Sequence, residues 1–129
     1  MSRVSKRILI VDDEESILFA VKRYFTRMGF GVDCARELEE AEALVAHTAY
    51  NLVIADLSLS DSGSAEGLEI IRFVRRHCPA ARVILLTAYG SPSVEKEALK
   101  RGADVFLHKP KPLAELATIV TQLTEGPRS

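Results

Sequence analysis

The chain has 129 residues, the length of one domain with a single hydrophobic core. Hydrophobic residues make up 47% and charged residues 27% of it, and the formal net charge is −1; this balance excludes the strong basic excess typical of nucleic-acid-binding domains. No apolar run reaches the ~20 residues of a membrane span, and the polar N-terminus lacks the apolar core of a signal peptide. We therefore expect one cytoplasmic domain over residues 1–129, with its core over about 6–125 and no contact with nucleic acid or membrane.

Three expected strands and two expected helices fill the first half of the chain. Short runs rich in apolar and β-branched residues indicate strands at Ile8–Val11, Gly31–Ala35 and Leu52–Ala55. Apolar residues spaced three and four apart indicate helices at Ile17–Met28 and Glu37–His47. Gly29 is a suitable residue to end the first helix.

The second half continues the alternation of strands and helices. The segment Ser58–Gly67 is rich in Ser, Gly and Asp and is expected to be a loop. Two further apolar runs indicate strands at Val83–Leu86 and Val105–Leu107. Helical spacing indicates helices from Leu68 to Cys78, at Ser93–Arg101 and at Pro112–Glu125.

Polar residues end four of the five expected strands. Strands that alternate with helices form a parallel sheet with helices on both faces, and ligands bind at the carboxyl ends of such strands. The polar residues at these ends should therefore meet at one edge of the sheet; they are Asp12, Asp13, Asp56, Thr87 and Lys109.

Three carboxylates in one place repel one another unless a cation lies among them. Oxygen ligands of this kind suit a hard divalent ion, and Mg²⁺ is the usual one. We expect Asp13 and Asp56 to bind Mg²⁺ directly, Asp12 to bind it through water, and the backbone carbonyl of Ser58 to add a further ligand.

A carboxylate next to such a metal ion has the chemistry to take up a phosphoryl group. Asp56 is the expected nucleophile, because carboxylates attack activated phosphoryl groups to give acyl phosphates. The transferring group spreads negative charge over three oxygens. Mg²⁺, the Lys109 ammonium and the Thr87 hydroxyl would each stabilise part of that charge.

Four motifs occur in a fixed order along the chain: Ile8–Glu14, Leu52–Asp56, Leu85–Ala88, and Gly102–Asp104 followed by Lys109-Pro110. Together, over about residues 6–125, they resemble the receiver domain of the response regulators of two-component signal transduction. The resemblance implies a flavodoxin-like, doubly wound sheet of five parallel strands in the order 2-1-3-4-5, with five helices.

The same resemblance implies a function and two further features. Asp56 would accept a phosphoryl group from a histidine kinase or phosphotransfer protein with Mg²⁺ as cofactor, and the domain would then act on an effector domain or target protein. Phe106 matches the aromatic switch position of the family, which responds together with Thr87. The Lys109-Pro110 peptide bond is expected to be cis.

The chain departs from the family pattern near the phosphoacceptor and in the last helix. Ser60 replaces a common Pro, Gly67 lies about three residues later than usual, and Lys111 replaces an apolar residue. Many DNA-binding relatives use paired acids in the fifth strand and arginines in the last helix for dimer contacts. Here Asp104 is followed by Val105, and residues 112–125 contain no Arg or Lys, so that dimer is not predicted.

Other interpretations remain open at this point. Taken singly, Asp12 or Asp13 could cap a helix, Asp56 could be a turn residue, and Phe106 could be core. An aspartate-nucleophile phosphatase is disfavoured because that chemistry usually needs a second acid two residues after the nucleophile. A receiver-like interaction module that is never phosphorylated is the main alternative, although such a module would be expected to lose part of the acid, Thr and Lys set.

Overall fold

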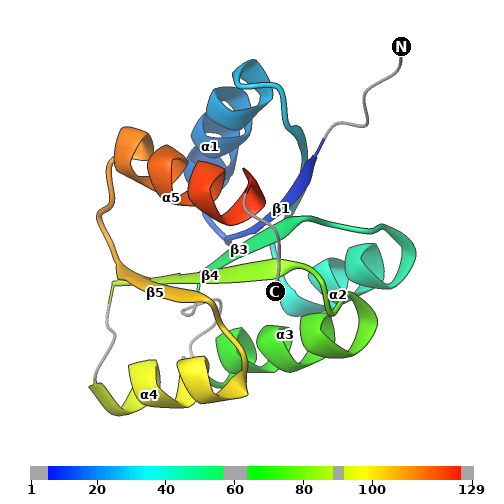
Figure 1. Ribbon diagram of the computed structural model, residues 1–129, viewed down its shortest axis with the longest axis vertical. Coiled ribbons are helices and arrows are strands. Elements are labelled where there is room, and N and C mark those ends of the chain that lie inside the picture. The colour runs from blue at the N-terminus through cyan, green and yellow to red at the C-terminus, as the bar shows by residue number, and fades with distance from the viewer. Residues whose placement is uncertain (1–5, 57–63, 89–91, 126–129) are drawn as a thin grey trace.

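The computed structural model of the protein describes residues 6–56, 64–88 and 92–125 (Figure 1). Five strands alternate with five helices along these residues. The strands are β1 (Arg7–Val11), β2 (Gly31–Ala35), β3 (Leu52–Asp56), β4 (Arg82–Thr87) and β5 (Val105–His108). The helices are α1 (Glu15–Arg27), α2 (Leu38–His47), α3 (Ser64–His77), α4 (Pro92–Arg101) and α5 (Leu113–Glu125).

The strands form one parallel sheet in the order β2-β1-β3-β4-β5. Figure 1 shows α1 and α5 on one face of this sheet and α2, α3 and α4 on the other. The predicted flavodoxin-like architecture is therefore confirmed. Among the described residues, no helix combines the length and the apolar character needed to cross a bilayer.

Two hydrophobic clusters hold the helices on the sheet, one on each face. Side chains alternate along β1, so Leu9 and Val11 join the cluster under α2, α3 and α4, whereas Ile8 and Ile10 join the cluster under α1 and α5. All five residues of β3 are buried, as expected for a central strand covered on both sides. This double burial fixes where each strand ends, and so fixes the positions of the polar residues there.

The start of α3 differs from the sequence prediction. The segment Ser58–Gly67 was expected to be a loop, but the helix begins at Ser64. Ala65 and Glu66 favour helix strongly, and this preference extends the helix back from the apolar residues that begin at Leu68. The remaining part of the predicted loop, including Ser58 and Ser60, lies outside the described residues.

Two glycines follow the ends of helices in a backbone conformation that other residues rarely adopt. Gly29 after α1 has φ 102° and Gly102 after α4 has φ 118°. A side chain at Gly29 would meet nothing within 4 Å, whereas a Cβ at Gly102 would lie 3.1 Å from carbons of the Arg75 side chain. The turn from α4 into β5 is thus packed closely against α3.

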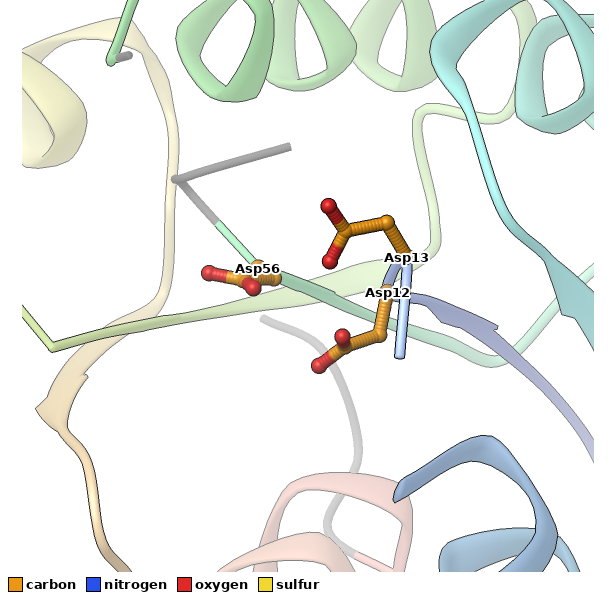
Figure 2. Close-up of side chains that lie close together, drawn as sticks. All are labelled: Asp12, Asp13 and Asp56. Atoms are coloured by element: carbon orange, nitrogen blue, oxygen red, sulfur yellow. The ribbon is translucent and has the colours of Figure 1, made fainter. Parts of the chain in front are cut away.

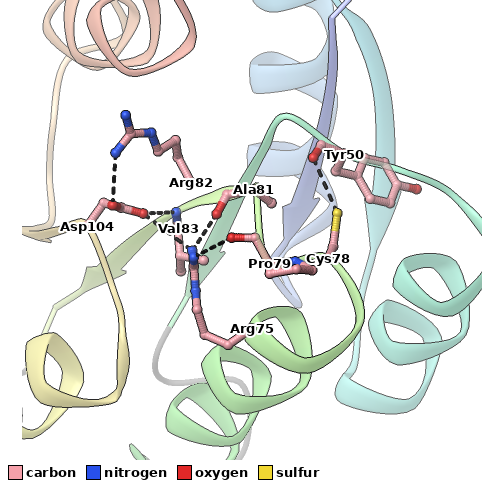
Figure 3. Close-up of polar contacts among 8 residues, drawn as sticks. All are labelled: Tyr50, Arg75, Cys78, Pro79, Ala81, Arg82, Val83 and Asp104. Carbon is pink, nitrogen blue, oxygen red and sulfur yellow. Dashed lines mark hydrogen bonds and ion pairs between the residues drawn. The ribbon is translucent and has the colours of Figure 1, made fainter. Parts of the chain in front are cut away.

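Asp104 anchors this turn to the start of β4 (Figure 3). Its carboxylate accepts a hydrogen bond from the Val83 N–H at 2.8 Å and pairs with Arg75 at 3.4 Å and Arg82 at 3.3 Å. Arg75 also donates to the carbonyls of Pro79 and Ala81. The beginning of β5 is therefore held at the amino ends of the strands. The acidic residues lie at the opposite, carboxyl ends.

Candidate functional site

Asp12, Asp13 and Asp56 meet at the carboxyl ends of β1 and β3 (Figure 2). One oxygen from each carboxylate lies within 4.8 Å of the others. Asp12 and Asp56 are only 3% and 6% exposed, whereas Asp13 is exposed. The predicted convergence of the three acids is confirmed, and the cluster opens to solvent on the side of Asp13.

The ends of the strands hold the two buried acids in place. Asp56 is the last residue of β3, between β1 and β4 in the sheet. Asp12 follows β1 directly, and its N–H donates to the Ala35 carbonyl at 3.0 Å. The Asp12 carboxylate in turn accepts a hydrogen bond from the Glu14 N–H at 2.9 Å, which fixes the turn into α1. The N-cap of α1 is Glu14, so neither Asp12 nor Asp13 takes that position.

Lys109, which directly follows β5, bridges the two buried acids. Its ammonium lies 3.0 Å from Asp56 Oδ2 and 3.1 Å from Asp12 Oδ2. Burial of the ammonium acts to lower the pKa of Lys109, but the hydrogen bonds to Asp56 and Asp12 outweigh it, and the pKa is raised above its ordinary value. Lys109 therefore stays charged at neutral pH and offsets part of the negative charge of the cluster.

The peptide bond after Lys109 is cis, as the sequence resemblance predicts. The N–H of Lys109 donates to the Thr87 carbonyl at 2.7 Å, which joins the end of β5 to the end of β4. Thr87 itself is the last residue of β4 and is 1% exposed. Lys109 and Thr87 thus belong to one hydrogen-bonded corner of the sheet, next to the acids.

Three carboxylates and one ammonium give this group of side chains a formal charge of −2. Carboxylate oxygens at this spacing suit a hard divalent cation, which takes oxygen ligands and keeps several waters. The Asp13 carboxylate is exposed, so an ion held by the three acids would stay in contact with water. The donor set therefore fits a divalent metal ion.

Phe106 lies in the core cluster under α2, α3 and α4 and is 9% exposed. The ring of this predicted switch residue is therefore buried, and its response together with Thr87 stays a prediction. Ser58 lies outside the described residues. His108, at the end of β5, contacts Phe106 with ring centroids 5.5 Å apart.

Comparison with known proteins agrees with this geometry. The sequence model of the response regulator receiver domain matches residues 8–121. The chain is 36% identical over 120 residues to the response regulator protein PilR of Pseudomonas aeruginosa, covering 93% of this chain and 26% of PilR. It is 32% identical to the photosynthetic apparatus regulatory protein RegA of Rhodobacter capsulatus over 105 residues, covering 81% of this chain and 55% of RegA.

Solved structures give the same result. A CheY-like receiver domain protein from Methanospirillum hungatei superposes with a TM-score of 0.85 at 31% identity, covering 95% of this chain and 96% of that one. A response regulator from Burkholderia pseudomallei, solved with a phosphorylated aspartic acid and a calcium ion, gives 0.82 at 30% identity, covering 94% of this chain and 68% of that one.

The chain spans about a quarter to a half of the length of these curated relatives, so it corresponds to one part of each of them. The family match runs from β1 into α5 and includes Asp12, Asp13, Asp56, Thr87 and Lys109. The chain therefore belongs to the family of response regulator receiver domains.

Proposed function

We propose that this receiver domain accepts a phosphoryl group on Asp56 from the phosphohistidine of a histidine kinase or phosphotransfer protein, with Mg²⁺ as cofactor. The observation that carries the proposal is the position of Asp56, buried between an acidic pair and the Lys109 ammonium. The phosphorylated aspartic acid and calcium ion in the Burkholderia relative support the same chemistry here.

In the proposed transfer, a carboxylate oxygen of Asp56 bonds to phosphorus while the bond from phosphorus to the donor's histidine nitrogen breaks. The electron pair of that bond stays on the histidine nitrogen. Lys109 already binds Asp56 and is placed to bind a phosphoryl oxygen in the product, which stabilises the charge that develops during transfer. Thr87, at the end of the neighbouring strand, would donate its hydroxyl to another oxygen.

The metal ion would be held by the three acids. We assign Asp13 and Asp56 as direct ligands and Asp12 as a ligand through water, because Asp12 already binds both Lys109 and the Glu14 N–H. The backbone carbonyl of Ser58, outside the described residues, is the proposed further ligand. Bound Mg²⁺ would neutralise phosphoryl oxygens and lower the repulsion between them and the carboxylates.

Phosphorylation would act through Thr87 and Phe106 on a protein-interaction surface. A phosphoryl group adds about −1.5 to −2 charges and strong acceptor oxygens. If Thr87 moves toward them, the space beside Phe106 changes, and the packing of α4 and β5 changes with it. The partner would be an effector domain or a target protein, which fits a chain that matches only part of its longer relatives.

The alternative function is an interaction module that is not phosphorylated. Treating the protein with a small acyl phosphate, with and without Mg²⁺, separates the two. We expect Mg²⁺-dependent phosphorylation that disappears in Asp56→Asn. Wild-type protein that takes up no phosphate under these conditions, or from a phosphohistidine donor, would favour the interaction module.

A further inference from the structure

His108, the last residue of β5, lies between the two proposed switch residues. The register of β4 and β5 sets His108 directly opposite Thr87, and Phe106 directly opposite Leu85. Side chains alternate along a strand, so Phe106 and His108 lie on the same face of the sheet, the face covered by α2, α3 and α4. His108 is thus the neighbour of Thr87 across the strands and of Phe106 along its own strand.

The imidazole of His108 packs with its plane nearly perpendicular to the Phe106 ring. The ring centroids are 5.5 Å apart and the planes meet at 81°, which is the edge-to-face geometry that aromatic pairs prefer. Phe106 is 9% exposed whereas His108 is exposed, so the imidazole stands at the solvent side of a buried ring. The imidazole therefore covers part of the Phe106 ring.

The two ends of β5 are held by different partners. The turn before β5 is held by Asp104, which binds the Val83 N–H, Arg75 and Arg82 (Figure 3). Phe106 and His108 lie beyond this anchor, toward the acidic corner. The other end of β5 is joined to Thr87 itself, because the Lys109 N–H donates to the Thr87 carbonyl at 2.7 Å. A displacement of the Thr87 backbone therefore reaches β5 first at this end, where His108 is the direct neighbour of Thr87.

We propose that His108 is a positioning residue of the switch: its imidazole holds the Phe106 ring in the core and passes a displacement of Thr87 on to that ring. This inference rests on the proposed function, because Thr87 and Phe106 are assigned to the response there. It adds the residue that connects them. The contact requires an aromatic ring at position 108, and a small side chain there leaves the ring of Phe106 without its outer wall.

NMR spectroscopy of the ¹³C-labelled phenylalanine rings tests the proposal. The Phe106 signals are assigned with Phe106→Leu, and spectra are recorded with and without beryllofluoride and Mg²⁺. In unphosphorylated His108→Ala, we expect the ratio of buried to outward ring to fall about two- to tenfold, the range that corresponds to the energy of one aromatic pair. In the same variant, beryllofluoride should change the Phe106 signals less than it does in wild type.

Two further variants separate the positioning role from a general loss of packing. His108→Phe keeps an aromatic edge at this place and should restore both the wild-type ring signals and their response. His77→Ala is the matched control, since His77 is also exposed and stacks on Phe73 with centroids 4.1 Å apart, in α3. It should leave the Phe106 signals unchanged.

The comparison of unphosphorylated His108→Ala with wild type needs no phosphate. It therefore distinguishes failure of this inference from failure of the proposed function. Unchanged Phe106 signals in His108→Ala overturn the positioning role, whether or not Asp56 accepts phosphate. The same change in His77→Ala, or no rescue by His108→Phe, also overturns it. A wild-type protein that takes no phosphate on Asp56 overturns the proposed function, and the proposed link from Thr87 falls with it.

Discussion

Lys109 Nζ lies 3.0 Å from Asp56 Oδ2, although the two residues are 53 positions apart in the chain. The same ammonium lies 3.1 Å from Asp12 Oδ2, so one cation holds two buried carboxylates before any metal or phosphate binds. This contact makes Lys109 both a structural tie and a cation in direct contact with the proposed phosphoacceptor.

Replacing Lys109 with methionine should slow phosphorylation of Asp56 by about 100-fold, the usual effect of removing one donor that stabilises developing charge. It should also lower the free energy of unfolding without Mg²⁺ by about 2 kcal/mol, because Asp12 and Asp56 are left buried without their cation. Urea unfolding and the rate of labelling by a small acyl phosphate measure the two effects.

The control for this change is the neighbouring lysine. Lys111 pairs with the exposed Glu115 at 3.7 Å, so Lys111→Met should change stability by less than about 0.5 kcal/mol and leave the labelling rate nearly unchanged. Equal effects of the two substitutions would mean that the contact of Lys109 with the acids has no special role.

The pKa of Lys109 should be above its ordinary value, and the rise should be smaller in Asp56→Asn, which removes one of the two anionic partners. Because the folded-state pKa is raised, the stabilisation is fully present below the unfolded pKa of lysine and is lost as pH rises through the folded value. Titration of the Lys109 side-chain NMR signals gives the pKa directly. A value at or below that of an exposed lysine would contradict the assigned contacts.

Asp13→Ala should abolish Mg²⁺ binding more completely than Asp12→Ala, since Asp13 is assigned as a direct ligand and Asp12 as a ligand through water. Asp12 is also committed to Lys109 and to the Glu14 N–H, which supports the same order. Titration of each variant with Mg²⁺, followed by calorimetry, decides the matter. Equal losses or the reverse order would reject the assignment of the ligands.

Gly102→Ala should destabilise the protein more than Gly29→Ala. Both glycines have positive φ, so both substitutions cost about 1–2 kcal/mol of backbone strain. Only at Gly102 would the new Cβ also press on Arg75, at 3.1 Å, and disturb the contacts of Arg75 with Asp104. Chemical unfolding of the two variants measures the difference, and equal losses would show that Arg75 moves aside without cost.

Most of the site could be predicted because its residues sit at positions that the chain pattern fixes. Continuous apolar runs that end abruptly in Asp12, Asp56 and Thr87 give the ends of the strands, and a parallel sheet brings these ends to one edge. The first residue of a helix is harder to predict. The early start of α3 at Ser64 was missed because the Ser, Gly and Asp content of that segment favoured a loop.

The contacts that depend on side-chain geometry could not be predicted. Arg75 and Asp104 pair across 29 positions, and neither lies in a pattern that distinguishes an ion pair from two solvated charges. The alternation along the fifth strand puts His108 on the same face as Phe106, but it does not predict the edge-to-face contact between the two rings.

Locating the phosphoryl group by mass spectrometry tests the central claim most directly. The protein is treated with a small acyl phosphate and Mg²⁺, the acyl phosphate formed on the chain is reduced with borohydride, and the peptides are sequenced. We expect that the reduced residue is Asp56 alone, that labelling requires Mg²⁺, and that Asp56→Asn carries no label. Label on another aspartate, or equal labelling of Asp56→Asn, would contradict it.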